Sequence, residues 1–412
     1  MSSEWPVQRL DQIAEINPAR KVRKGSVVPF VDMAALPQHS RDIGAEGVLV
    51  REAKGAGAHF QNGDTLLARI TPCLENGKTA QVRCLDGDAI AEGSTEFIVL
   101  CGKDPEDNDF IYYLCREPAF REYAIGRMEG TSGRQRVSWQ SIAAYEFAFP
   151  PPDERRAAAC VLSALDDRIT LLRETNATLE AIAQALFKSW FVDFDPVRAK
   201  MEGRAPEGMD EATAALFPDA LEETELGPVP RGWRVGIVSD LAKIKGGKQL
   251  EKSSFSDGFH NPVFGGAGVM GYTDLSNADG LVITVGRVGA YCGQFFWHFG
   301  RAWVNNNASR IDPTHDGHGL WLYQWLQQAD IESIKKGAAQ PFVSNSDISA
   351  MKLVIPTDEA IRLFVGTAEA LYERMQQNNF QAQTLATLRD TLLPRLISGQ
   401  LRVPEAIEAT LA

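Results

Sequence analysis

The sequence predicts a mixed α/β protein of the α+β class, in which two globular domains alternate with two long helices in a pseudo-two-fold repeat. Between residues 153 and 191, apolar side chains recur at alternating steps of three and four, as on the buried side of a coiled-coil helix. A similar series returns 206 residues later. The strand-like run 137–150 before the first series also matches the run 343–356 before the second. The expected order is therefore domain, helix, domain, helix.

Two helical seams carry this prediction. The first consists of Leu162, Leu165, Ile169, Leu172, Asn176, Leu179, Ala183, Leu186 and Trp190. The second consists of Ala368, Leu371, Met375, Asn378, Ala382, Leu385, Arg389, Leu392 and Leu396. Arg389 interrupts the apolar series, and Pro394 is expected to end or kink the helix just before it. Asn176 and Asn378 each place an amide in a seam, where a polar residue can fix helix register, and the repeat offset predicts that they lie in different layers.

The first globular domain reads as short strands separated by turn residues, with aromatic residues at helical spacing between 110 and 123. Its predicted strands cover residues 30–31, 65–70, 81–83, 97–100 and 146–149. An acidic segment with proline and glycine follows the first helix and is typical of a connector. The predicted segments are 1–152, the first domain; 153–194, the first helix; 195–230, a linker; 231–357, the second domain; and 358–400, the second helix with a C-terminal tail.

A glycine-rich stretch in the second domain raises the question of a nucleotide site. Residues 266–271 match G-x-G-x-x-G, the fingerprint of dinucleotide binding. That fingerprint needs a buried strand before it and a helix after it, whereas Asn261-Pro262 precedes and a strand-like run at 281–285 follows. The pattern therefore favours a hairpin turn over a dinucleotide or S-adenosylmethionine site.

No catalytic motif is found. The chain lacks both an Asn/Asp-Pro-Pro-aromatic motif of amino-group DNA methyltransferases and a phosphate-binding Walker loop. The adjacent carboxylates of Asp166 and Asp167 are expected to be solvated on a helix surface. We therefore expect no enzyme activity and no cofactor.

The formal net charge of −12 would by itself disfavour a nucleic-acid partner, but the charge is unevenly distributed along the chain. Residues 201–232 contain two basic and eight acidic side chains and so account for half of that charge. Basic clusters occur elsewhere, at 20–24, 127–136, 243–248 and 335–336, and each could equally be a solvated surface. Contact with phosphate depends on such local clusters rather than on the total charge.

The chain shows no sequence sign of a membrane span, a disulfide framework or a metal site. No apolar run approaches the length of a membrane helix, and the N-terminus lacks the regions of a signal peptide. The six cysteines form no Cys-x-x-Cys pair, and the six histidines form no His-x-x-x-His pair. We expect a cytoplasmic protein with reduced thiols.

Four stretches resemble the specificity subunit of type I restriction-modification systems, and they follow that family's order over nearly the whole chain. They are Leu-Phe-Lys-Ser-Trp-Phe-Val-Asp-Phe-Asp-Pro at 186–196, Glu-Leu-Gly-Pro-Val-Pro-Arg-Gly-Trp at 225–233, Phe-Gly-Gly-Ala-Gly-Val-Met-Gly-Tyr at 264–272 and Leu-Leu-Pro-Arg-Leu-Ile-Ser-Gly-Gln at 392–400. Val263, Phe264 and Ala267 stand where family members often have tyrosine and asparagine. This departure bears on which bases are read.

The resemblance implies a non-catalytic subunit that recognises double-stranded DNA. The domains 1–152 and 231–357 would be target-recognition domains, and the two helices would be spacers that pack antiparallel as a coiled coil. The subunit would recruit two adenine-methylating modification subunits and, in the full assembly, ATP-dependent restriction subunits. A coiled-coil scaffold without DNA contact is the alternative, and it accounts for the helices but not for two domains with basic, glycine-rich loops.

The helix length agrees with a role in spacing. About 38 helical residues span roughly 57 Å, whereas one turn of DNA is about 34 Å. Two reading domains at the ends of such a helix would contact two half-sites separated by bases that they do not touch. Because the two domains differ in length and in their loops, we expect the target to be bipartite and asymmetric.

Candidate DNA contacts lie in corresponding loops before the repeated last strand of each domain. They are Thr131, Arg134, Arg136 and Ser138 in the first domain and Gln340, Ser344 and Asn345 in the second, with Arg69, Lys78, Lys248 and Arg287 as further candidates. The aromatic residues Trp190, Phe191 and Phe194 end the first helix with more apolar surface than a two-helix seam needs. They are a candidate partner interface, and burial within the chain is the alternative.

Overall fold

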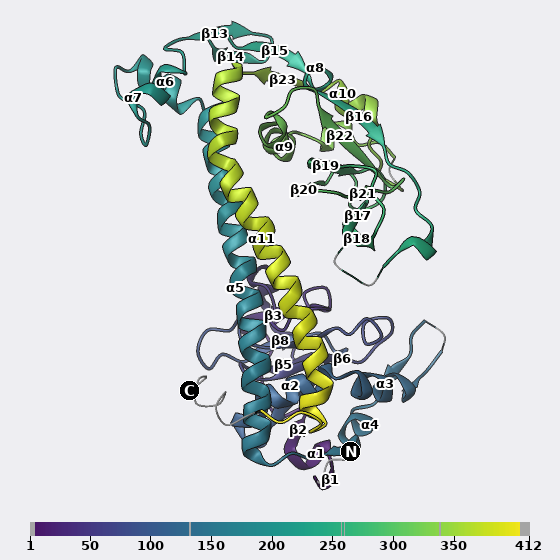
Figure 1. Ribbon diagram of the computed structural model, residues 1–412. Helices are drawn as coiled ribbons and strands as arrows, with labels where there is room; N and C mark the ends of the chain where they lie inside the picture. The colour runs from purple at the N-terminus through teal and green to yellow at the C-terminus, as the bar shows by residue number, and fades with distance from the viewer. Residues whose placement is uncertain (1–4, 132, 257, 259, 338, 404–412) are drawn as a thin grey trace. The chain divides into compact units, whose positions relative to one another are not determined.

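The computed structural model describes residues 5–131, 133–256, 258, 260–337 and 339–403 (Figure 1). Its contacts form two compact units, which we call unit 1, Met1–Arg173 with Phe380–Ala412, and unit 2, Glu174–Asn379. Each boundary falls inside one of the two long helices, α5 (Pro152–Phe191) and α11 (Asp358–Ile397). Adding the repeat offset of 206 to residue 174 gives residue 380, so the two boundaries occupy equivalent positions of the repeat.

Unit 1 contains a mixed domain followed by the first half of α5. Its strands are β1 (Val7–Arg9), β2 (Ala14–Ile16), β3 (Val27–Val31), β4 (Val48–Glu52), β5 (Ala58–Phe60), β6 (Thr65–Ala68), β7 (Thr79–Gln81), β8 (Ala91–Gly93), β9 (Phe97–Gly102), β10 (Met128–Glu129), β11 (Arg136–Val137) and β12 (Glu146–Ala148). Its helices besides α5 and α11 are α1 (Leu10–Ile13), α2 (Asn108–Arg116), α3 (Pro118–Gly126) and α4 (Trp139–Ala143), with short 3-10 turns at Ala45–Gly47 and Pro105–Asp107.

Unit 2 contains the second half of α5, a connecting segment and a second mixed domain. Its strands are β13 (Leu221–Thr224), β14 (Gly227–Pro230), β15 (Arg234–Ile237), β16 (Ala242–Gly246), β17 (Asn261–Gly265), β18 (Gly268–Thr273), β19 (Leu281–Gly286), β20 (Phe295–Phe299), β21 (Trp303–Val304), β22 (Ala308–Pro313) and β23 (Lys352–Ile355). Its other helices are α6 (Asp195–Met201), α7 (Glu211–Ala215), α8 (Val238–Leu241), α9 (Gly319–Gln328) and α10 (Asn345–Ser349), with 3-10 turns at Lys252–Ser254 and Glu332–Ile334.

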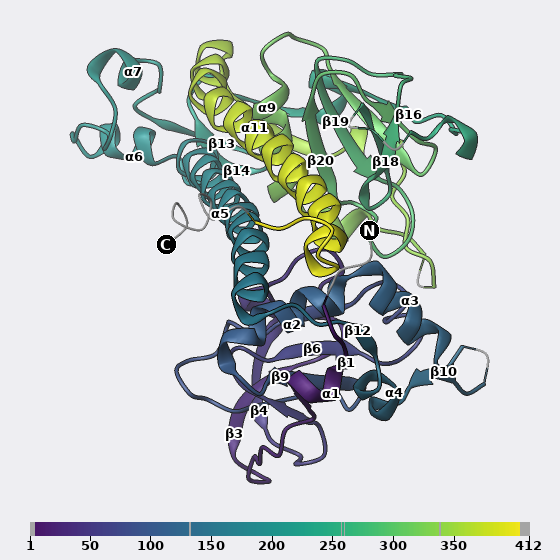
Figure 2. The same ribbon diagram turned by 60° about the horizontal axis from the view of Figure 1, so that its bottom comes forward.

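The two domains share one sheet topology. Unit 1 has a sheet of order β2-β9-β6-β7, and unit 2 has its counterpart β16-β22-β19-β20. A second sheet has order β4-β3-β8-β5 in unit 1 and β18-β17-β21 in unit 2, so a partner for β21 equivalent to β5 is missing from the described part of unit 2. In each domain the first strand pairs antiparallel with the last, β1 with β12 (Figure 2) and β15 with β23 (Figure 1). The sequence repeat is therefore a repeat of fold.

The long helices pair antiparallel in each unit. In unit 1, Leu162 of α5 shares a core with Leu393 of α11, and Leu172 packs with Ala382. In unit 2, Phe187 of α5 packs against Phe364 of α11, with ring centroids 5.6 Å apart. As residue numbers rise along α5 they fall along α11, which confirms the antiparallel arrangement.

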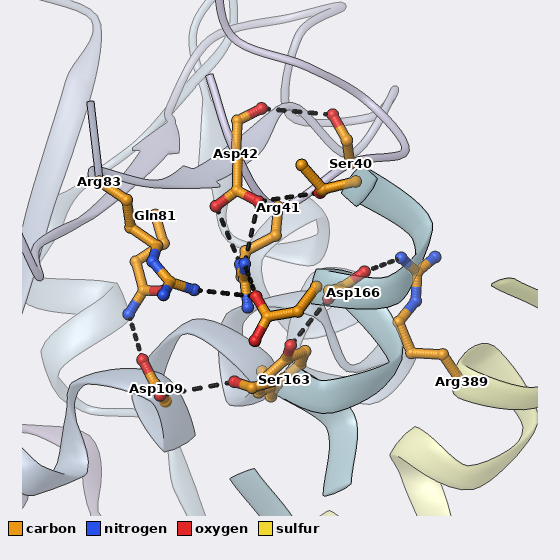
Figure 3. Close-up of polar contacts among 12 residues, drawn as sticks. Ser40, Arg41, Asp42, Gln81, Arg83, Asp109, Ser163, Asp166 and Arg389 are labelled. Atoms are coloured by element: carbon orange, nitrogen blue, oxygen red, sulfur yellow. Dashed lines mark hydrogen bonds and ion pairs between the residues drawn. The ribbon is translucent and has the colours of Figure 1, made fainter. Parts of the chain in front are cut away.

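Arg389 does not spoil the second seam, because its charge is paired. In unit 1 its guanidinium donates to Asp166 of α5, and Tyr113 of α2 donates its hydroxyl to the same carboxylate over 2.7 Å. Figure 3 shows Arg389 reaching Asp166. Asp166 is 3% exposed and Arg389 is 5% exposed. The expectation that Asp166 is a solvated surface residue is therefore wrong. Its neighbour Asp167, which stays exposed, accepts from the buried Arg41.

Pro394 does not end α11. The helix continues to Ile397, which gives it 40 residues. A proline removes one backbone donor, and here the loss falls in the last turn, where Leu393, Leu396 and Ile397 are buried in the core of unit 1. Packing of this last turn therefore outweighs the intrinsic preference of proline.

The aromatic residues at the end of α5 are enclosed by unit 2 itself. Trp190, Phe191 and Phe194 are 7%, 7% and 8% exposed. Phe191 packs against Phe364 and Trp233, with ring centroids 5.6 Å and 5.8 Å apart. The structure thus supports burial within the chain, the alternative to a partner interface at these three residues. Among the described residues, no helix is long and apolar enough to cross a membrane.

Candidate nucleic-acid interface

Arg69 and Arg287 occupy the same position in the two units. Arg69 directly follows β6, and Arg287 directly follows β19, the strand that holds the same place in its sheet. The backbone carbonyls of the two arginines also make equivalent hydrogen bonds. The carbonyl of Arg69 accepts from the N–H of Val137 over 2.9 Å, and the carbonyl of Arg287 accepts from the N–H of Val343 over 3.0 Å. Because residues 137 and 343 are related by the repeat offset of 206, the two arginines are structural equivalents.

Neither guanidinium group has an acidic partner among the described residues. Nε of Arg69 and Nε of Arg287 are buried and have no hydrogen-bond partner among the described residues. Arg69 lines an open depression together with Asn17 and His59. On the other domain, a Cβ added to Gly246 would lie 3.6 Å from Nη1 of Arg287, so the end of β16 adjoins this guanidinium.

A hairpin borders each arginine. In unit 1, β10 and β11 pair, and Arg136 forms a bridge with Ile70, the residue after Arg69. In unit 2, Lys336 pairs with Phe342, and Phe342 forms a bridge with Val288. The loops predicted to correspond from the sequence therefore lie beside equivalent arginines.

The predicted contacts in the first loop differ in how free they are. Thr131 and Arg134 are exposed, and the side chain of Arg134 has no ion pair within the described residues. Arg136 instead makes a bidentate ion pair with Glu96, with donor–acceptor distances of 2.6 Å and 3.0 Å to one carboxylate oxygen. Hydrogen bonding to Glu96 raises the pKa of Arg136 above its usual value. Arg134 is thus available to a phosphate, whereas Arg136 would act together with Glu96.

The serines predicted as contacts have structural roles. Ser138 caps α4 by accepting from the N–H of Ser141 over 3.0 Å, and Ser344 caps α10 by accepting from the N–H of Asp347 over 3.1 Å. Their equivalence across the repeat reflects these caps. Both hydroxyl groups already accept a hydrogen bond from a helix N-terminus, so a contact with a base would compete with the caps.

Of the four remaining predicted contacts, two are engaged and two are exposed. Lys78 donates to the carbonyl of Met33 over 2.7 Å, and Asn345 accepts from the hydroxyl of Ser309 over 2.7 Å. Lys248 and Gln340 have exposed side chains. Among the described residues, these four side chains do not form a cluster in either unit.

Reasoning from the sequence missed Glu96, Val288 and Phe342 as members of these loops. Phe342 directly precedes the repeated Val343, at the position that Arg136 holds in unit 1, so its place could have been found by continuing the alignment. Glu96 gave no such signal, because its partner Arg136 lies 40 residues away in the chain.

The glycine-rich stretch forms a hairpin, as predicted. Gly266 and Ala267 connect β17 to β18, and Gly268 has φ +97°, a conformation that favours glycine. The turn passes close to the end of β19, since a Cβ on Gly286 would lie 2.2 Å from the carbonyl oxygen of Gly266. These glycines therefore allow two backbone segments to approach. No cluster of three or more His, Cys, Asp or Glu side chains suited to a metal occurs among the described residues.

Comparison with known proteins finds similar chains in one family. Residues 230–381 match the model of the type I restriction modification DNA specificity domain. The chain is 28% identical to the type I restriction enzyme HindI specificity subunit of Haemophilus influenzae, over 83% of this chain and 87% of that protein. It is 24% identical to the type I restriction enzyme MjaIX specificity subunit of Methanocaldococcus jannaschii, over 98% and 94%.

A solved structure shares the fold. The S subunit of a type I restriction-modification system from M. genitalium matches with a TM-score of 0.54 and 17% identity, covering 95% of this chain and 96% of that one. The chain is therefore similar to specificity subunits of type I restriction-modification systems over nearly its whole length, and residues 230–381 match the DNA specificity domain of that family.

Proposed function

We propose that this chain selects the DNA sequence on which a type I restriction-modification complex acts. Each unit reads one short duplex segment with the face that carries Arg69 or Arg287. Together the two units define a bipartite target. The observation that carries the proposal is the equivalence of these two arginines, each fixed by its backbone and each lacking an acidic partner among the described residues.

An unpaired guanidinium on a rigid strand end suits base recognition. Arginine donates two parallel hydrogen bonds to O6 and N7 of guanine in the major groove, and each such pair discriminates by about 1–3 kcal/mol. Burial of Nε restricts the side chain before DNA arrives, which lowers the entropy lost on binding. Exposed Arg134 and Lys248 would add contacts to phosphate that position the duplex without reading it.

The domain assignment follows from this role. Residues 1–152 and 231–357 are the two target-recognition domains, 153–194 and 358–400 are spacer segments, and 195–230 connect the first spacer to the second domain. The loops beside the arginines differ between the domains, with Arg136 in one and Phe342 in the other. The two half-sites therefore differ in sequence, and the target is asymmetric.

The chain supplies recognition, and its partners supply the chemistry. It assembles with two DNA-methylating modification subunits and with restriction subunits that use ATP, and it acts in the cytoplasm, where the DNA is. The net charge of −12 does not oppose DNA binding, because half of it lies in residues 201–232 and outside both recognition domains.

Mapping adenine methylation in a genome tests this function. The modification subunit is expressed alone, with this chain, or with the variant Arg69→Ala/Arg287→Ala, and methylated positions are read by long-read sequencing. A bipartite motif should be methylated only when the intact chain is present. The proposal is wrong if the same motif is methylated by the modification subunit alone, or if the assembled complex methylates no specific motif.

A further inference from the structure

At the end of β19, unit 2 has the exposed phenyl ring of Phe342 where unit 1 has Arg136 in an ion pair. Val288 and Phe342 form a bridge between neighbouring segments and are 41% and 40% exposed. Their equivalents in unit 1 are Ile70 and Arg136, which form the same bridge. These exposed apolar side chains lie next to Arg287, the arginine proposed to read DNA.

A third position follows the same contrast. The N–H of Arg69 donates to the carbonyl of Glu96, and the N–H of Arg287 donates to the carbonyl of Asn307, both over 3.0 Å. In unit 1 the Glu96 carboxylate binds Arg136. In unit 2 the equivalent positions hold an uncharged amide and a phenyl ring, so one face is ionic and the other is uncharged.

The backbone holds the apolar pair in position. Both the N–H and the carbonyl of Phe342 bond to Lys336, over 2.8 Å and 3.0 Å. The N–H of Gly289 donates to the carbonyl of Pro341 over 2.9 Å, which ties the segment after Val288 to the loop. Gly337, at φ +85°, leaves space for the ring, since a Cβ there would lie 3.3 Å from Cδ1 of Phe342. The two side chains are thus presented by fixed segments.

We propose that Val288 and Phe342 contact the C5 methyl group of a thymine in the half-site that unit 2 reads. This rests on the proposed DNA-binding function and adds to it the class of base. The thymine methyl is the apolar group that base pairs present in the major groove, and apolar side chains recognise it by contact. At the position of Phe342, unit 1 instead offers the donors and acceptors of the Arg136–Glu96 pair, and only Ile70, the equivalent of Val288, is apolar there.

Duplex DNA is the occupant that the surroundings favour. Arg287 precedes Val288 directly, and its guanidinium lacks an acidic partner among the described residues. Exposed Lys248 lies on the segment that follows β16, whose Gly246 adjoins Arg287. An apolar protein surface would leave these cations unpaired, whereas DNA supplies phosphates and base acceptors beside a methyl group.

Replacing thymine by deoxyuridine tests the contact, because uracil lacks only the C5 methyl group. The methylated motif is first determined for the complex of this chain with its modification subunits, and Arg287→Ala identifies the half-site of unit 2 as the one that loses specificity. Duplexes with deoxyuridine at each thymine position in turn are then titrated at fixed salt. At one position in that half-site, binding should weaken about fourfold, the value of one buried methyl group.

The variants Val288→Ala and Phe342→Ala should bind the thymine duplex more weakly and should lose the difference between thymine and deoxyuridine at that position. Leu275→Ala removes another exposed apolar side chain of unit 2, 48% exposed, and should keep the difference. The inference is wrong if the half-site of unit 2 contains no thymine, if no deoxyuridine duplex binds more weakly, or if both variants retain the full difference. Reduced assembly of the variants with modification subunits, at unchanged base preference, would also overturn it. Failure of the unmodified complex to prefer its motif would instead contradict the proposed function.

Discussion

The side-chain amide of Asn378 donates a hydrogen bond to the side-chain carbonyl of Asn176 across the two long helices of unit 2, over 2.8 Å. The amide of Asn176 in turn donates to the carbonyl of Met375 over 3.0 Å. The expectation that the two asparagines lie in different layers is therefore wrong. Antiparallel pairing matches residues whose numbers have a constant sum, so the offset of 206 relates equivalent positions rather than partners.

Removing one asparagine should cost more than removing both. Asn378→Leu leaves the partly buried side-chain oxygen of Asn176 without its donor and should lower the free energy of unfolding by about 1–3 kcal/mol. The variant Asn176→Leu/Asn378→Leu should recover most of this, because the equivalent layer of unit 1 is Leu172 with Ala382 and is apolar. Urea unfolding followed by tryptophan fluorescence reports mainly on unit 2, which holds six of the eight tryptophans. Additive losses in the double variant would contradict this coupling.

The ion pair of Asp166 and Arg389 should behave in the same way in unit 1, with larger effects. Arg389→Met strips the buried Asp166 of its countercharge and should destabilise by about 3–5 kcal/mol. Asp166→Leu/Arg389→Met should destabilise less than Arg389→Met, since no charge is left uncompensated. Exposed Arg395→Met in the same helix is the matched control and should change stability by less than about 0.5 kcal/mol. Equal losses in Arg389→Met and Arg395→Met would show that the pair is unimportant, and urea unfolding followed by circular dichroism decides.

Glu180 should make unit 2 more stable as the pH falls. Burial raises its pKa, although hydrogen bonds with Gln184, Tyr372 and Gln324 oppose the shift. A carboxyl group with a higher pKa in the folded than in the unfolded state binds its proton more tightly when folded. Its contribution to stability therefore increases as the pH falls through the folded pKa, and it becomes level below the unfolded value of about 4.3.

Glu180→Gln tests this sign, because the amide keeps the hydrogen-bonding shape without the charge. The variant should be more stable than the original chain at neutral pH, and the difference should shrink as the pH is lowered toward 4.5. Thermal unfolding of both proteins at matched pH values measures it. A constant difference at all pH values would mean that Glu180 does not titrate with folding.

The periodicity of the sequence predicted the parts of the fold that local chemistry determines. The three-four spacing gave both long helices, and the glycine and turn residues gave the hairpin at Gly266. Burial of Asp166 and Arg389 could not be predicted, because the two residues lie 223 positions apart and each looks like a surface charge or a fault in the seam until the partner helix is placed. The same holds for Trp190, whose pocket comes from several distant segments of unit 2.

The candidate site was only partly predictable. The fixed offset of 206 aligned Ser138 with Ser344, and those positions are helix caps. Arg69 and Arg287 differ by 218, so an insertion within the domain hid their equivalence from a comparison at a constant offset. Backbone hydrogen bonds to Val137 and Val343 reveal it, because topology aligns residues where sequence spacing does not.

Lengthening both helices should widen the gap between the half-sites. We expect that four helical residues inserted after Asn176 and four before Asn378 keep the antiparallel register and extend the pair by about 6 Å, close to two base pairs. Four residues rotate the helix by slightly more than one turn, so the reading face is nearly preserved. The methylated motif should keep both half-sites and gain one or two central bases. An unchanged motif would show that α5 and α11 do not set the spacing, and an altered half-site with the original gap would contradict their role as well.

The central claim is that Arg69 and Arg287 read bases in separate half-sites. Mapping adenine methylation with the single variants Arg69→Ala and Arg287→Ala, each assembled with the modification subunits, tests it most directly. Each variant should relax the sequence requirement at about one base pair, with a loss of about 1–3 kcal/mol of discrimination there, and the two relaxed positions should lie in different half-sites. Relaxation of the same half-site by both variants, or an unchanged motif in either, would contradict the account.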